Sequence, residues 1–128
     1  MRLDGTYPHM NEPWFILTKR LGSDVITPSP SVLDAAMREV VDPSHAGDIE
    51  HTSAFVRFGY DEGSMYVLSY DTSLRLTFEQ WADQDFEVEL APTAYLSNVS
   101  PSNAARLMQE LSAGAVDRVK QEPWTPVE

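Results

Sequence analysis

The residues whose types and spacing could do chemistry form a run of carboxylates in the second half of the chain. The run has five acids within eleven residues, contains no basic residue and encloses Trp81; its acids are Glu79, Asp83, Asp85, Glu87 and Glu89. Two carboxylates that face each other across a cleft, one of them with a raised pKa, can act as general acid and base. Because the chain has 20 acidic residues, such a pair would arise by chance, and the run indicates a charged surface rather than a catalytic pair.

No other pattern predicts catalysis, a cofactor or a metal. Of three histidines, His45 and His51 flank a polar loop that holds Asp48 and Glu50, and these residue types can bind zinc. Their spacing matches no helical histidine pair, so we expect solvated side chains and no metal. The chain has no cysteine, and it has neither a Gly-x-Ser-x-Gly elbow nor a glycine-rich phosphate loop. The sequence therefore predicts a protein that is not an enzyme and uses no cofactor.

The net charge discriminates between classes of partner. The formal charge is -11, and the segment 39–90 holds twelve of the acidic residues but only two basic ones, Arg57 and Arg75. Nucleic-acid phosphates and anionic membranes are disfavoured by this charge. A basic protein would be attracted, and its association would be accelerated. We therefore expect a basic protein partner, no direct nucleic-acid contact and no membrane.

Length and composition are those of one small globular domain. The chain has 128 residues, of which 42% are hydrophobic, and no apolar stretch approaches the roughly 18 residues of a membrane span. Residues 1–13 lack periodicity and the apolar segment of a secretory signal, so we expect a flexible arm and a cytoplasmic location. A single domain is expected over residues 14–128, as a monomer.

Two helices are predicted by the same start signal, a serine followed by a proline. Ser29 and Pro30 precede a run with apolar residues on one helical face, which ends before Asp42-Pro43. Ser100 and Pro101 precede a second apolar stripe, and Gly114 suits its end.

The middle of the chain predicts antiparallel strands separated by turns. Strands are expected at 14–18, 25–27, 54–58, 65–70, 74–78, 86–90 and 93–96, with a loop at 79–84. On the strand 86–90, alternation would place Phe86, Val88 and Leu90 inward. The fold expected is α+β, a mainly antiparallel four- to five-stranded sheet with two helices packed on one face.

The outward side of that predicted strand gives a candidate binding surface. Asp85, Glu87 and Glu89 would project from one face about 7 Å apart and repel one another, which favours a binding role over a structural one. Aromatic anchors within a charged rim are typical of protein interfaces. The partner-binding residues predicted are Tyr60, Asp61, Glu62, Glu79, Trp81, Asp83, Asp85, Glu87 and Glu89.

The order of elements resembles that of bacterial polymorphic-toxin immunity proteins. The residues that carry the resemblance are Val25-Ile26-Thr27-Pro28 before the first helix, Met65-Tyr66-Val67-Leu68, Val99-Ser100-Pro101, Ala104, Leu107, Leu111, Gly114 and Pro123-Trp124. The resemblance implies a protein that neutralises a cognate toxin by covering its basic active-site surface with an acidic face.

Two other functions remain open from the sequence. One is a phage-type inhibitor or nucleic-acid mimic, in which the acidic stripe imitates phosphates and blocks a DNA-binding protein. The other is an acidic secretion chaperone, which would bind an unfolded segment in an apolar groove and would be dimeric. Promiscuous binding to DNA-binding proteins would favour the first, and a dimer would favour the second.

Overall fold

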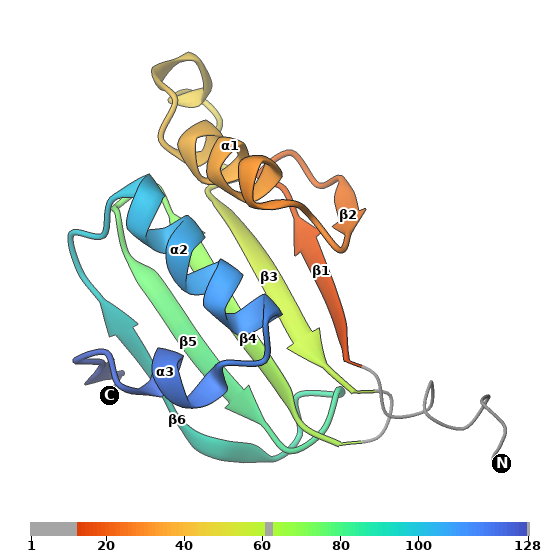
Figure 1. Ribbon diagram of the computed structural model, residues 1–128. Helices are drawn as coiled ribbons and strands as arrows, with labels where there is room; N and C mark the ends of the chain where they lie inside the picture. The colour runs from red at the N-terminus through yellow and green to blue at the C-terminus, as the bar shows by residue number, and fades with distance from the viewer. Residues whose placement is uncertain (1–12, 61–62, 128) are drawn as a thin grey trace, which may run out of the picture.

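Seven antiparallel strands form one sheet in the order β2-β1-β3-β4-β5-β6-β7 (Figure 1). The computed structural model describes residues 13–60 and 63–127. The strands are β1 (Trp14–Thr18), β2 (Asp24–Ile26), β3 (Ser53–Gly59), β4 (Met65–Asp71), β5 (Leu76–Trp81), β6 (Glu89–Leu96) and β7 (Thr125–Pro126). The α+β class and the antiparallel sheet are confirmed, but the expected number of four to five strands is wrong. The sheet is wider because β2 and β7, which have three and two residues, pair at its two edges.

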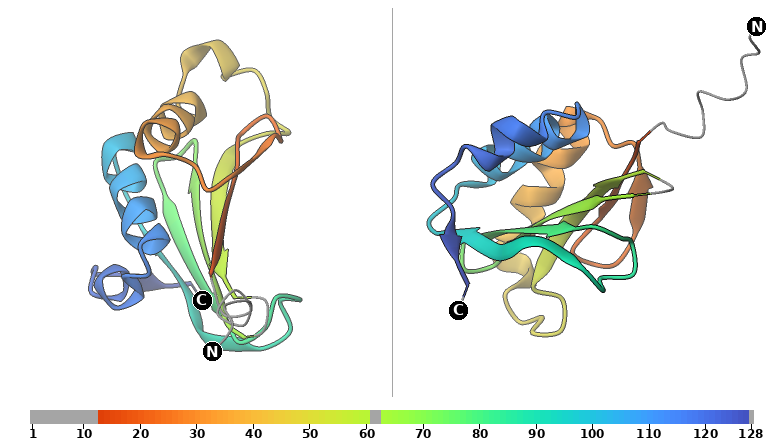
Figure 2. Two further views of the ribbon diagram at one scale, coloured as in Figure 1. Left: turned by 45° about the vertical axis from the view of Figure 1, so that its right-hand side comes forward. Right: turned by 90° about the horizontal axis from the view of Figure 1, so that it is seen from below.

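In the described part of the chain, three α-helices lie on one face of this sheet (Figure 2). They are α1 (Pro30–Val40), α2 (Pro101–Ser112) and the short α3 (Val116–Lys120), and a 3-10 turn, η2 (Pro43–His45), follows α1. The side chains of Ser29 and Ser100 accept hydrogen bonds from the third amide after each, and a proline occupies the first helical position in both cases. The predicted starts of α1 and α2 are therefore confirmed, whereas α3 was not predicted.

The core lies between the helices and the sheet face that they cover. The helices contribute apolar residues at helical spacing, and the strands contribute alternate residues. The strand residues are Phe15, Leu17, Ala54, Val56, Phe58, Leu68, Tyr70, Leu76 and Phe78, all nearly or fully buried. Trp124 closes the sheet end of this core: its ring centroid is 5.1 Å from that of Phe78, and its indole N–H donates to the Val119 carbonyl at 2.8 Å.

The predicted strand over residues 86–90 is wrong. β5 continues through Trp81, within the segment predicted as a loop, and β6 begins only at Glu89. Phe86 has a positive φ of 60°, which no strand residue adopts. The three side chains predicted to face inward are instead exposed, at 49% for Phe86, 56% for Val88 and 52% for Leu90.

The predicted arm, residues 1–13, lies outside the described residues except for Pro13. Within the part of the chain that the structure describes, no helix has the length and apolar character needed to cross a membrane.

Candidate functional site

The loop that joins β5 to β6, residues 82–88, is organised by one carboxylate. We call it the acidic loop. The Asp83 side chain accepts hydrogen bonds from the backbone amides of Asp85 at 2.8 Å, Glu87 at 3.1 Å and Val88 at 2.9 Å. The two ends of the loop are joined by the Ala82 amide, which donates a hydrogen bond to the Val88 carbonyl at 2.7 Å. An aspartate that binds amides two or more residues ahead stabilises a turn, so this segment folds as a loop rather than as an extended strand.

The pKa of Asp83 is lowered below its usual value. Its hydrogen bond with the Glu87 amide is the largest cause, and the amides of Asp85, Val88 and Phe86 add to it, while partial burial opposes the effect. Hydrogen bonds to the charged form favour ionisation. Asp83 therefore holds the acidic loop as a carboxylate at neutral pH, and its charge is directed at the backbone of the loop.

Beyond Asp83, acidic and apolar side chains alternate at the surface. Every residue from 85 to 90 is exposed, with the sequence Asp-Phe-Glu-Val-Glu-Leu. Asp85 and Glu87 lie in the loop and Glu89 begins β6, so the regular ladder of carboxylates expected from one strand is not formed. The Glu89 carboxylate accepts a hydrogen bond from the Thr93 hydroxyl at 3.2 Å. The result is a mixed surface in which three apolar side chains lie among three acids.

Trp81 connects this surface to the sheet. Its ring meets that of Phe86 edge to face, with centroids 5.2 Å apart and an interplanar angle of 79°. Its indole N–H donates to the Glu79 carboxylate at 2.9 Å. Both Trp81 and Glu79 are half-buried and lie on the sheet face opposite to the helices, in register with Met65 and Val67 of β4. The Phe86 ring thus packs against Trp81 on one side and is about half exposed to solvent.

The remaining predicted site residues are Tyr60, Asp61 and Glu62, which follow β3 in the sequence. Tyr60 is half-buried and packs against Phe58, with ring centroids 6.0 Å apart and edge to face. Its carbonyl accepts a hydrogen bond from the Gln84 side chain, which connects the residue after β3 to the acidic loop. Asp61 and Glu62 lie outside the described residues.

Sequence reasoning missed the exposed apolar residues of this surface. These apolar residues alternate with acids at the period of a half-buried strand, so the sequence pattern predicts a strand with the apolar side chains buried. The signal that could have found the loop is the Asp-x-Asp of residues 83–85, because aspartates of this spacing are frequent in turns.

The histidine-containing segment between α1 and β3 is held by hydrogen bonds within the protein. The Asp48 carboxylate lies 2.9 Å from His51 Nδ1 and also accepts hydrogen bonds from the backbone amides of Glu50 and His51. These hydrogen bonds lower the pKa of Asp48, and the bond with the His51 side chain contributes most. Across residues 13–60 and 63–127, no three His, Asp or Glu side chains are grouped closely enough to hold a metal ion.

Comparison with known proteins finds no matching family model, no matching curated protein and no matching solved structure. The resemblance to immunity proteins is therefore untested by relatives, and the functional argument depends on the surface itself.

Proposed function

We propose that this protein is an immunity protein that binds a cognate bacterial toxin and neutralises it by covering the toxin's basic active-site surface. The contact surface would be the acidic loop with its neighbours, residues 81–90. The observation that carries the proposal is the exposed alternation of acidic and apolar side chains from Asp85 to Leu90.

The apolar side chains support binding rather than simple solvation. Phe86, Val88 and Leu90 are each about half exposed in one short segment, and their exposure costs free energy in water. Clustered exposed apolar residues with a polar rim are typical of interaction sites. A phenyl ring supported by Trp81 is the kind of rigid anchor that contributes most of the binding energy at an interface.

The charged side chains support a basic partner. Neither Asp85 nor Glu87 forms an ion pair with another residue in the described part of the chain, and the nearby Asp83 adds a third negative charge. Lysine and arginine side chains on a partner could pair with these carboxylates while the apolar groups are buried. Steering by such charges would raise the association rate and would weaken as salt is added. Toxins that act on nucleic acids or nucleotides carry basic surfaces of this kind.

A nucleic-acid mimic, a second function considered from the sequence, stays an alternative that the loop geometry favours less. Mimicry depends on carboxylates spaced as regularly as phosphates, and the loop places Asp85 and Glu87 off any strand. A secretion chaperone stays an alternative that a dimer in solution would favour.

The first test is a growth assay with the product of the neighbouring gene, expressed with and without this protein. Toxicity of the neighbour and rescue by this protein support immunity. A neighbour that is harmless, or that stays lethal in the presence of this protein, contradicts it.

The second test maps the surface with two variants of equal charge change. The triple variant D85K/E87K/E89K is expected to lower the affinity for the toxin at least tenfold and to abolish rescue. The control D24K/E50K/D117K alters three exposed acids outside the surface and is expected to retain both. Equal affinity of the two variants, measured by calorimetry, would show that the acidic loop is not the contact surface.

A further inference from the structure

A pocket of about 300 Å³ lies on the sheet face opposite to the core. It is lined by Trp14 and Ile16 of β1, Arg57 of β3, Met65 of β4 and Gln84 of the acidic loop. Strand register explains how these residues meet, because Ile16 pairs with Arg57, and Trp14 and Met65 both pair with Gly59. The pocket therefore has apolar walls from three adjacent strands and one cationic side chain.

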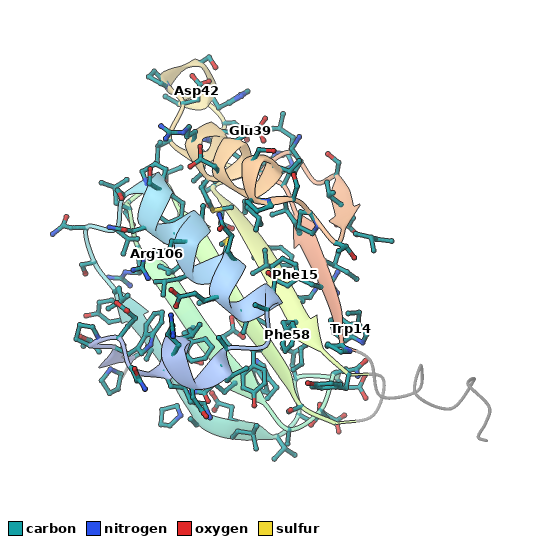
Figure 3. The ribbon with its side chains drawn as sticks, viewed as in Figure 1. Trp14, Phe15, Glu39, Asp42, Phe58 and Arg106 are labelled. Carbon is teal, nitrogen blue, oxygen red and sulfur yellow. The ribbon has the colours of Figure 1, made fainter. Side chains whose placement is uncertain are left out.

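The apolar walls are held in place by packing. Trp14 lies at the start of β1 (Figure 3), and its indole lies across Gly59, where a Cβ atom would approach two ring carbons to 3.0 Å. Met65 is 2% exposed although no described helix covers this face. A glycine at position 59 thus allows the indole to lie flat over β3, and the ring forms a rigid side of the pocket.

Arg57 is the unusual member of the set. Its Nε atom is buried and has no hydrogen-bond acceptor among the described residues, and none of their carboxylates lies within ion-pair distance of its guanidinium. Glu79 lies two strands away from Arg57, because both residues pair with Val67 of β4. The Glu79 carboxylate accepts a hydrogen bond from the Trp81 indole N–H. The Arg57 guanidinium is 5.9 Å from the Phe55 ring, which is at the outer limit of a cation–π contact.

A cation in this state favours an anionic ligand. The fold has already removed water from part of the guanidinium, so an anion that binds there does not have to displace that water. Partial burial also lowers the effective dielectric constant and strengthens the attraction. A carboxylate matches the planar donors of arginine and can accept two hydrogen bonds from them.

We propose that this pocket binds a carboxylate that is joined to an aromatic or aliphatic group. The carboxylate accepts hydrogen bonds from the Arg57 guanidinium, and the apolar group packs against Trp14, Ile16 and Met65. A volume of about 300 Å³ is at the lower end of small-molecule pockets, and it suits a ligand of roughly ten non-hydrogen atoms. This site shares Gln84 with the contact surface of the proposed toxin complex, but Arg57 and the apolar walls lie outside that surface, and its test needs no toxin.

The test is a titration of the full chain with 3-phenylpropanoate and with its neutral amide, 3-phenylpropanamide, followed by ¹H–¹⁵N NMR at pH 7. The acid is expected to shift the Trp14 indole signal and the Arg57 Nε–H signal in a saturable way, with a dissociation constant of roughly 1 mM or below. The amide is expected to bind at least tenfold more weakly, because it cannot form the charged pair.

Variants of the two arginines in this acidic region provide the matched comparison. R57M is expected to remove the preference for the acid over the amide, and R57K to retain part of it. R75M is the control, since Arg75 stacks on Tyr95 at 4.2 Å outside the pocket, and it is expected to bind as the original chain does. No saturable shift with the acid, equal affinity for acid and amide, or unchanged preference in R57M would overturn the proposal.

Acetyl-glycyl-phenylalanine separates two sources of the same chemistry. It carries the carboxylate and the phenyl group at a peptide C-terminus. Tighter binding than 3-phenylpropanoate identifies a peptide C-terminus as the ligand, and weaker binding identifies a free acid.

Discussion

The stability of the segment between α1 and β3 depends on one buried arginine, and its removal is the sharpest test of the fold. Arg20 follows β1 and is 2% exposed. Its guanidinium donates to the carbonyls of His51 at 2.6 Å, His45 at 2.8 Å and Asp48 at 3.2 Å, and also to the carbonyl of Val40. These carbonyls belong to the end of α1 and to the loop after it, so a single side chain fixes the path of residues 40–51.

The cost of removing this guanidinium follows from those four bonds. A hydrogen bond to a charged group contributes about 1.5–3 kcal/mol, and a neutral one about 1 kcal/mol. The lower value is appropriate here, because a pocket of about 470 Å³ borders Arg20 and would admit water to the released carbonyls. Four bonds at about 1 kcal/mol each predict that R20M lowers the free energy of unfolding by about 3–5 kcal/mol.

Urea unfolding followed by tryptophan fluorescence measures this change. The control is R38M, because Arg38 is exposed and makes an i,i+4 pair with Asp34 at 2.7 Å, which is worth only about 0.3–0.5 kcal/mol. A loss below about 1 kcal/mol in R20M, or equal losses in the two variants, would refute the view that Arg20 holds this segment.

Two further predictions concern single side chains. Y70F should lower the free energy of unfolding by about 1–2 kcal/mol in urea, because the buried Tyr70 hydroxyl donates to the Val99 carbonyl at 2.6 Å. Burial raises the pKa of Tyr70, and Asp71 adds a smaller contribution. The stability that the protonated hydroxyl contributes is therefore complete below about pH 10 and is lost as pH rises further. A free energy of unfolding that stays constant above about pH 10 would contradict this. The pKa of Asp83 is lowered, so the stability that its carboxylate contributes is present above about pH 4 and is lost as pH falls below that value. The protection factor of the Glu87 amide, which compares its exchange rate with that of an unstructured peptide at the same pH, should follow this change. D83N should lose that protection at neutral pH as well, and unchanged exchange would show that the carboxylate does not hold the loop.

The helices could be predicted because their signals are local. Ser29 and Ser100 each cap the helix that starts at the next residue, and both prolines occupy the first helical position. A cap depends only on residues three apart in the sequence, so one stretch of sequence suffices to identify it. The central hairpin was also found, since β3 and β4 are rich in aromatic and β-branched residues and a segment with two glycines, 59–63, separates them in the sequence.

The acidic loop could not be predicted because two interpretations share one pattern. Alternating residues from 85 to 90 fit a half-buried strand, and only the hydrogen bonds of Asp83 to three amides decide for a loop. Those bonds compete with strand pairing, and propensity does not reveal which of the two is more stable. The edge strand β7 could not be predicted for a different reason. It has only two residues, one of them a proline, which is too short for an alternating pattern.

The unusual states of two arginines were equally hidden in the sequence. Arg20 is bonded to carbonyls that lie 20 to 31 residues further along the chain. The buried Nε atom of Arg57 has no acceptor among the described residues, and the Glu79 carboxylate accepts the Trp81 indole N–H. Both depend on tertiary contacts between distant segments. Residue type alone predicts an exposed arginine in each case.

The acids of the loop divide into one that sets its shape and others that set its charge. Asp83 is bound to the backbone, whereas the carboxylates of Asp85 and Glu87 extend into solvent. Gln84 transmits the shape further, because its side chain donates to the Tyr60 carbonyl and also lines the Arg57 pocket. Removal of the Asp83 carboxylate would therefore change the loop and the pocket together, and weaker binding in D83N would report on the changed shape and on one lost charge at the same time. Only variants of Asp85, Glu87 and Glu89, which leave the Asp83 carboxylate in place, can measure what the negative charge itself contributes.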